Sequence, residues 1–343
     1  MRTLSLTRLS ASIGVALAIL SAAIALAVCV GSSAGFGWPG GPRADEIVAS
    51  RRDIAALAAI VGLGLGAAGA AFQSVLRNDL ADPYLLGIAS GAAVGAYAWR
   101  LPIFAGAIAS LGDGMSNAGQ PAFAFGGALV AAASVLALSG GPNRRVEPSS
   151  VVLVGVIVST LCGAIVLLLF TFAKSMPGSG SVQSVMIGEL QTSLTRAQFW
   201  TAAVIVTLGT LTLWWRSPQL NVVALGDDEA RAMGLRTHRE RLLVLAIASL
   251  VTAAAVSVSG PIGFVGLIAP HVARRIVGSD ARLALPVAAI AGAILLVLAD
   301  ALLRFLVGVR VVNTLIPIGV ATALLGAPFF LALLFRVQRM VER

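Results

Sequence analysis

Long apolar runs alternate with short polar stretches along the whole chain. A helix of about 20 apolar residues crosses the hydrocarbon core of a bilayer, and most of the runs reach about that length. The runs are continuous rather than alternating residue by residue, which excludes a transmembrane β-barrel. The pattern therefore predicts an all-α polytopic membrane protein with about ten transmembrane helices, over residues 10–30, 54–74, 84–100, 121–138, 150–173, 197–215, 241–259, 262–277, 284–306 and 316–335.

Composition supports a membrane protein and narrows the remaining classes. Of the 343 residues, 58% are hydrophobic and only 11% are charged, and the mean hydropathy is +0.95. Soluble domains carry about 25% charged residues, so a soluble or disordered chain is excluded. The two cysteines, Cys29 and Cys162, lie inside apolar runs and cannot form a disulfide framework. Residues 1–343 are expected to form a single transmembrane domain.

The basic residues indicate how the chain is oriented. If the N-terminus lies inside, sixteen of the 24 Lys and Arg residues fall on the cytoplasmic side. This bias follows the positive-inside rule and places both termini in the cytoplasm. It also explains the net charge of +9 without binding to nucleic acid. Arg2 and Arg8 before the first run are typical of a signal peptide too, but a run of about 20 residues favours an uncleaved first helix.

Several chemical signatures are missing from the sequence. No Gly-x-x-x-x-Gly-Lys-Ser/Thr phosphate loop occurs, so this chain is not expected to bind ATP by that route. The only histidines are His238 and His271, and no catalytic triad or metal-ligand cluster can be assembled. Asp300 is the main acid within an apolar run. We therefore expect neither catalytic nor metal-binding residues, and the scarcity of buried acids weakens the alternative of a stand-alone secondary transporter or channel.

Two interruptions of the apolar pattern are candidates for moving parts. A polar break over Gln73–Gly87 separates two glycine-rich runs, and it suits either a gate or a plain cytoplasmic turn. Gly260–His271 contains three glycines and two prolines, which predicts a tight turn followed by a short helix. Gly62 and Gly66, like Gly91 and Gly95, recur every fourth residue, a spacing typical of closely packed helices.

The largest cytoplasmic segment spans residues 216–240. Asp227 and its acidic neighbours suit the first turn of a helix, and Gly234 suits its C-terminal end. Gly226, Ala230 and Gly234 would share one small face. The segment is expected to hold a short helix outside the bilayer, with a smooth face that a partner could grip, unless it is merely a connector.

Taken together, five stretches resemble the permease subunits of the bacterial type II ABC importers for iron-siderophores, haem and cobalamin. They occur in that family's order and are Gln73–Gly87, Leu225–Gly234, Gly260–His271, Leu298–Arg304 and Pro317–Phe329. The resemblance covers the chain from about Ile54 to Phe335. It implies the type II ABC importer permease fold: a homodimer in the lipid of the inner membrane, with two cytoplasmic ATPase subunits and a periplasmic substrate-binding protein. ATP and Mg would bind to the ATPase, and this chain itself would bind no cofactor. Haem or an iron-siderophore is the favoured ligand, and cobalamin stays open.

The resemblance also implies roles for particular residues. Asn78 and Leu80 match part of a cytoplasmic gate, and Ser149 and Ser150 fall near a second gate strip. Residues of the 216–240 segment match the helix that couples to the ATPase, namely Leu225, Gly226, Asp227, Ala230 and Gly234.

On the outer side, the implied role is contact with acidic residues of the binding protein. Arg51 and Arg304 match family positions of this kind, and Arg52 and Arg310 lie near the same helix ends. Asp300 precedes Arg304 by four residues and could pair with it on one helix instead. In the family this position begins an Arg-Leu-Pro-Arg pattern, whereas this chain reads Arg51-Arg52-Asp53-Ile54 and does not match the second arginine of the pattern. The contact is therefore expected to be arranged differently here.

Overall fold

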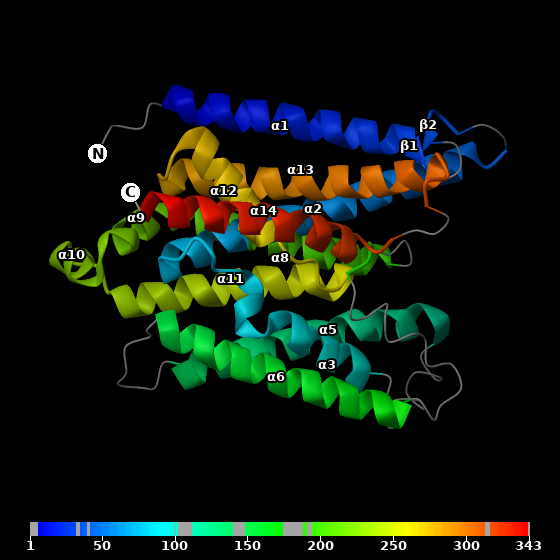
Figure 1. Cartoon of the computed structure of the whole chain (residues 1–343). Helices are drawn as coiled ribbons and strands as arrows, with labels where there is room; N and C mark the ends of the chain where they lie inside the picture. The colour runs from blue at the N-terminus through cyan, green and yellow to red at the C-terminus, as the bar shows by residue number, and fades with distance from the viewer. Residues whose placement is uncertain are drawn as a thin grey trace.

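The computed structural model describes residues 6–31, 35–39, 42–99, 101, 112–139, 148–173, 188–190, 194–312 and 316–341. Ten helices of eleven residues or more form one bundle (Figure 1): α1 Leu6–Cys29, α2 Ala44–Leu76, α3 Ile88–Ala98, α5 Gly112–Ser139, α6 Pro148–Ala173, α8 Arg196–Trp215, α11 Thr237–Ser259, α12 Val265–Val277, α13 Ala281–Gly308 and α14 Ile318–Val341.

Shorter elements connect these helices. A 3₁₀ helix, η1 Pro83–Leu86, precedes α3, while α9 Ser217–Leu225 and α10 Asp227–Ala232 lie between α8 and α11. β1 Val30–Gly31 and β2 Gly35–Phe36 pair antiparallel, with Val30 opposite Phe36.

Each of the ten predicted apolar segments forms a helix, but the helices differ in length. Within the described ranges, seven are long and apolar enough to cross a membrane, while α3 and the described apolar part of α14 are shorter. α12 has 13 residues, a rise of about 20 Å, which is less than the roughly 30 Å of a hydrocarbon core. α2 has 33 residues, about 50 Å, and extends beyond the core. The polytopic all-α fold is confirmed, and ten full-length spans is only an approximate count.

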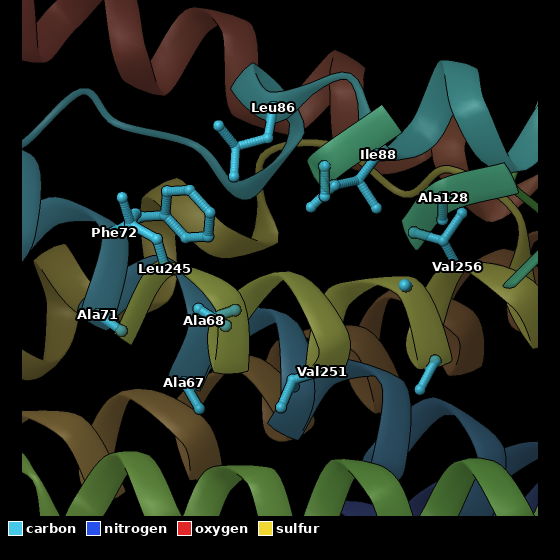
Figure 2. Packing of buried hydrophobic residues seen from close by; sticks show 14 of the residues in the cluster. Ala67, Ala68, Ala71, Phe72, Leu86, Ile88, Ala128, Leu245, Val251 and Val256 are labelled. Carbon is cyan, nitrogen blue, oxygen red and sulfur yellow. The ribbon is translucent and has the colours of Figure 1, made fainter. Parts of the chain in front are cut away.

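α2 is the central helix of the bundle. It packs along α13, α11 and α12, and 72% of its apolar window is buried, against 22% for α6. Figure 2 shows Ala67, Ala68 and Ala71 of α2 among larger side chains such as Leu245 and Val251 of α11. Small residues on a central helix let its neighbours approach closely from several sides.

The glycine stripes serve this packing. A Cβ added at Gly62 would lie 2.3 Å from the Gly292 carbonyl oxygen, and one at Gly66 would lie 2.3 Å from that of Ala288, both on α13. On α3, a Cβ added at Gly95 would lie 1.9 Å from the carbonyl oxygen of Phe123 in α5. The stripes are therefore contact faces between helices of one bundle, as their spacing indicates.

The two ends of the bundle carry different features. The start of α1, the end of α14 and the short helix α10 lie at one end in Figure 1, and the β1–β2 hairpin lies at the other. This agrees with an even number of crossings between the first and last helices. We call the end with α10 the inner end and the opposite end the outer end.

Candidate functional site

The turn after α2 is held in shape by its own polar groups. α2 ends at Leu76, and Arg77 adopts the left-handed conformation with φ 48°. The Asn78 side-chain oxygen accepts a hydrogen bond from the Leu80 amide at 2.9 Å, and the Asn78 carbonyl accepts one from Ala81 at 3.0 Å. Asn78 and Leu80 are both exposed. The break is therefore a defined turn that presents these two side chains at the surface of the bundle.

A cavity joins this turn to the second predicted gate strip. It has a volume of about 430 Å³ and is lined by Leu76, Asn78, Ser149, Val152, Leu153 and Val156. Ser149 lies in the first turn of α6, so the structure brings one residue of each strip together. Ser150 lies beside Ser149 in the chain but does not line the cavity, and Leu80 does not line it either. The assignment of these four residues as a gate stays a prediction.

The 216–240 segment forms two helices with a sharp corner between them. Gly226 stands at that corner with φ 149°, a conformation that disfavours any residue with a side chain. Asp227 begins α10, and Gly234 closes it with φ 81° while donating its amide to the Arg231 carbonyl at 2.8 Å. The acids do occupy the first turn of a short helix, as expected.

The smooth exposed face expected on this helix is wrong. The Ala230 side chain is fully buried, because α10 turns that side toward the rest of the chain. The exposed side chains at its ends are Leu225 and Met233, each 58% exposed. Gly226 is half-buried and Gly234 is exposed, so the sequence spacing identified three small residues but could not show that Ala230 at their centre packs inward.

Asp227 is the most connected side chain of the segment. Its carboxylate pairs with Arg77 Nη2 at 2.5 Å and with Arg241 at 2.6 Å and 3.1 Å. Burial alone would raise the pKa of Asp227, but the charges of Arg241 and Arg77 outweigh burial and hold that pKa below its ordinary value. Asp227 is therefore an internal junction rather than a free surface charge.

The start of the segment is also tied to the bundle. Asn221 of α9 donates to the Asp280 carboxylate at 2.7 Å and accepts from the Ala281 amide at 2.8 Å. Burial opposes ionisation of Asp280, but hydrogen bonds from Arg282 and Asn221 lower its pKa below the ordinary value. Acidic side chains thus fasten α9 and α10 to the neighbouring helices at two points.

A basic cavity of about 510 Å³ adjoins α10. Its lining includes Asp227, Arg231, Arg236, His238, Arg239 and Arg241. Asp227 is already paired with Arg77 and Arg241, and Arg231 pairs with Asp228 at 3.5 Å. The exposed Arg236 and Arg239 therefore keep the rim positively charged. This surface suits an acidic partner.

A second polar network links α2 to α12. Pro270 has no amide hydrogen, so it cannot donate to the carbonyl of Gly266 four residues earlier. The buried Gln73 side chain donates to that carbonyl instead, at 3.3 Å. The amide oxygen of Gln73 accepts from Arg274, which also pairs with Asp79 at 3.2 Å. Pro270 therefore does not break α12, which begins at Val265 after the predicted tight turn.

Two of the four arginines predicted to dock the binding protein at the outer end are buried. Arg51 is buried and donates to the carbonyls of Val28 and Gly37 at 3.1 Å and 3.3 Å. Arg304 is buried and pairs with Asp300, as the alternative interpretation of the sequence proposed. Arg52 and Arg310 are exposed. Docking of a binding protein stays a prediction, and of the four predicted residues Arg52 and Arg310 are the two that are accessible in the single chain.

No group of three or more His, Cys, Asp or Glu side chains that could hold a metal ion occurs in the described part of the chain. What the sequence reasoning missed are the two ion-pair networks around the turn after α2. Their only signal is that the polar break carries Arg77 and Asp79 on either side of Asn78. Their partners lie about 150 and 195 positions away, too far for pattern reasoning to pair them.

Comparison with known proteins gives a consistent result. The profile of the FecCD transport family matches residues 8–336. The cobalamin import system permease protein BtuC of Halobacterium salinarum is 40% identical over 278 residues, covering 81% of this chain and 70% of the relative. The hemin transport system permease protein HmuU of Yersinia pestis is 35% identical, covering 82% and 80%.

The fold has a close match among solved structures. A structure described as an inward-facing conformation of a metal-chelate type ABC transporter superposes with a TM-score of 0.77 at 26% identity, covering 94% of this chain and 98% of the other.

Proposed function

The chain belongs to the FecCD transport family, and from this premise we propose that it is the permease subunit of an ATP-driven importer in the inner membrane. Permease subunits of this family are non-catalytic, and ATP is hydrolysed on a separate subunit. The observation that carries the proposal is the family match over residues 8–336, which includes the bundle, the turn after α2 and both short helices α9 and α10.

The proposed assembly contains two copies of this chain and two cytoplasmic ATPase subunits. The ATPase docks on the exposed surface of α9 and α10 at the inner end of the bundle. ATP and Mg bind to the ATPase and not to this chain. Two features support this surface. Leu225 and Met233 expose apolar side chains in a segment outside the long apolar helices, and the basic cavity lies beside them. Exposed apolar side chains rimmed by charge are typical of protein interfaces.

The proposed route runs between the two copies. The cavity lined by Asn78 and Ser149 is open on one side, and a second copy placed there would close it. Leu153 and Val156 give it a weakly interacting wall. A weakly interacting lining suits a permease, because tight binding along the route would slow release of the ligand.

The proposed ligand is a large metal chelate, either haem or an iron-siderophore, with cobalamin as the alternative. The printed names of the relatives support this class, since they include a hemin and a cobalamin permease. A periplasmic binding protein would deliver the ligand to the outer end, where Arg52 and Arg310 can contact acidic side chains.

Reconstitution tests this function directly. The chain is placed in liposomes with its ATPase and binding protein, and uptake of haemin, a ferric siderophore and cyanocobalamin is measured with and without ATP. We expect one of the three to enter only when both partners and ATP are present. Uptake by the permease alone would instead establish a stand-alone transporter, and hydrolysis of ATP by the purified permease would contradict its non-catalytic role.

A further inference from the structure

Arg77 connects the predicted gate turn to the segment that we propose docks the ATPase. Its Nε donates to the Val223 carbonyl of α9 at 2.9 Å, and its Nη2 pairs with Asp227 of α10 at 2.5 Å. The planar guanidinium thus contacts both short helices at once, which a lysine could not do with the same geometry. Arg77 is also the residue immediately before Asn78 in the chain.

Asp227 is in turn fixed from a third element. Arg241 of α11 donates to both carboxylate oxygens, at 2.6 Å and 3.1 Å, and the Arg241 side chain is only 6% exposed. A carboxylate that accepts hydrogen bonds at both of its oxygens has little freedom to rotate away from its partners. Because its orientation is fixed, the carboxylate cannot rotate to absorb a shift of α10 together with α11, and such a shift acts on Arg77.

The far side of the turn is anchored to a different helix. Asp79 pairs with Arg274 of α12 at 3.2 Å, and Arg274 is itself held by Gln73. Asn78 thus sits between one link to α10 and another to α12. When α10 and α12 shift relative to each other, the strain falls on the residue between these two links.

We propose that Arg77 is a positioning residue that transmits movement of α10 to Asn78 through its contacts with Asp227 and the Val223 carbonyl. This inference rests on the proposed function. A purely structural role, in which Arg77 only ends α2, makes a different prediction: its loss would lower stability without separating ATP hydrolysis from movement of the gate.

The test uses the complete complex of permease, ATPase and binding protein in liposomes. Arg77→Gln removes the charge and the fork while leaving the Asp227–Arg241 pair intact, so the segment should still fold. Asp227→Asn is a second variant that breaks the same link from the other side, but it also removes the ion pair with Arg241, so its thermal unfolding is compared first. The matched control is Arg216→Gln. This variant breaks the ion pair between Arg216 and Glu240, whose N–O distance is 3.1 Å, and it does not touch the turn after α2.

Two readouts separate transmission from stability. The first is the amount of ligand imported per ATP hydrolysed, with haemin, a ferric siderophore or cyanocobalamin as the probe that the parent complex imports. The second needs no ligand: Asn78→Cys, in a chain whose Cys29 and Cys162 are replaced by serine, is cross-linked between subunits with and without ATP. Thermal unfolding of each variant reports stability independently.

For Arg77→Gln we expect ATP hydrolysis within about twofold of the parent and a drop of about fivefold in ligand imported per ATP, the size of a typical contact coupling. Cross-linking at position 78 should lose its dependence on ATP, and Arg216→Gln should retain both properties. Arg77→Gln with parental import per ATP and parental ATP-dependent cross-linking would overturn the inference. Failure of the proposed function would appear in the parent complex itself, as no ATP-driven uptake, and would remove the premise as well.

Discussion

Gln73 shows how one buried side chain can compensate for a proline on another helix. Its amide nitrogen donates to the Gly266 carbonyl that Pro270 leaves without a helical partner, and its amide oxygen accepts from Arg274. A polar side chain inside an apolar bundle is tolerated when each of its groups is satisfied. Gln73 meets this condition, and it fixes α12 against the end of α2.

Replacing Gln73 by leucine should therefore destabilise the protein beyond the loss of one hydrogen bond. Gln73→Leu keeps the volume of the side chain but leaves the Gly266 carbonyl without its donor and removes a partner of Arg274. Each unsatisfied buried group costs about 1–3 kcal/mol. Thermal unfolding in detergent would measure the loss. Ser74→Ala is the control, because Ser74 donates only to the Ala70 carbonyl of its own helix; equal melting temperatures for both variants would contradict this role of Gln73.

At the scale of single elements, the attachment of α9 and α10 depends on two ionised acids. Asp227 and Asp280 both have pKa values below the ordinary one, so their ion pairs and hydrogen bonds favour the ionised form. A group with a lowered folded pKa stabilises the fold above its unfolded pKa of about 3.9 and loses that effect as the pH falls through the folded value.

We accordingly expect the two short helices to stay attached from pH 8 down to about pH 4 and to detach only as the pH falls further, through the lowered pKa values of the folded protein. Hydrogen exchange of the backbone amides in residues 217–235, corrected for the intrinsic effect of pH, would measure this. The transition should weaken in Asp280→Asn, which removes one of the two acids. Protection that is lost already near pH 6, or an acid transition that Asp280→Asn leaves unchanged, would show that other groups hold the segment.

The orientation of α10 separates two neighbouring alanines. Ala230 is buried and Ala232 is exposed. Ala232→Trp should leave the bundle folded and prevent association with the ATPase, since the bulky ring projects from the proposed docking surface. Ala230→Trp should instead overpack the contact beneath α10 and lower stability by about 1–3 kcal/mol.

Melting temperature and co-purification of the ATPase would be measured for both alanine variants. An Ala232→Trp protein that binds the ATPase like the parent would exclude this face as the docking surface.

The sequence predicted some of these elements well, for physical reasons. Apolar runs of helical length identify the spans, because a helix needs about 20 residues to cross a bilayer. The spacing of Gly62 and Gly66 predicts close helix packing, because few other residues permit it. Side-chain direction was harder. The spacing of Gly226, Ala230 and Gly234 is the same whether their face points to solvent or to the bundle. Arg77 and Asp227 meet only through the folding of about 150 intervening residues.

At the scale of the whole molecule, the bundle has two chemically different ends. The inner end carries the start of α1, the end of α14, α10 and the basic cavity, and the outer end carries the β1–β2 hairpin. Basic residues concentrate on the cytoplasmic side of polytopic membrane proteins, because translocating them is unfavourable. The positions of the arginines therefore predict that α10 faces the cytoplasm, where an ATPase can reach it.

Labelling of single cysteines tests this orientation. In a chain with Cys29 and Cys162 replaced by serine, Asp228→Cys lies on α10 and Arg52→Cys lies near the start of α2, and the native side chains are 93% and 70% exposed. A membrane-impermeant maleimide added to right-side-out vesicles should label position 52 at once and position 228 only after the vesicles are opened. Leu161→Cys, on the exposed apolar face of α6, is the control and should resist the reagent in both states, since lipid covers it. Labelling of position 228 from outside would invert the topology, and an ATPase confined to the cytoplasm could then not dock on α10.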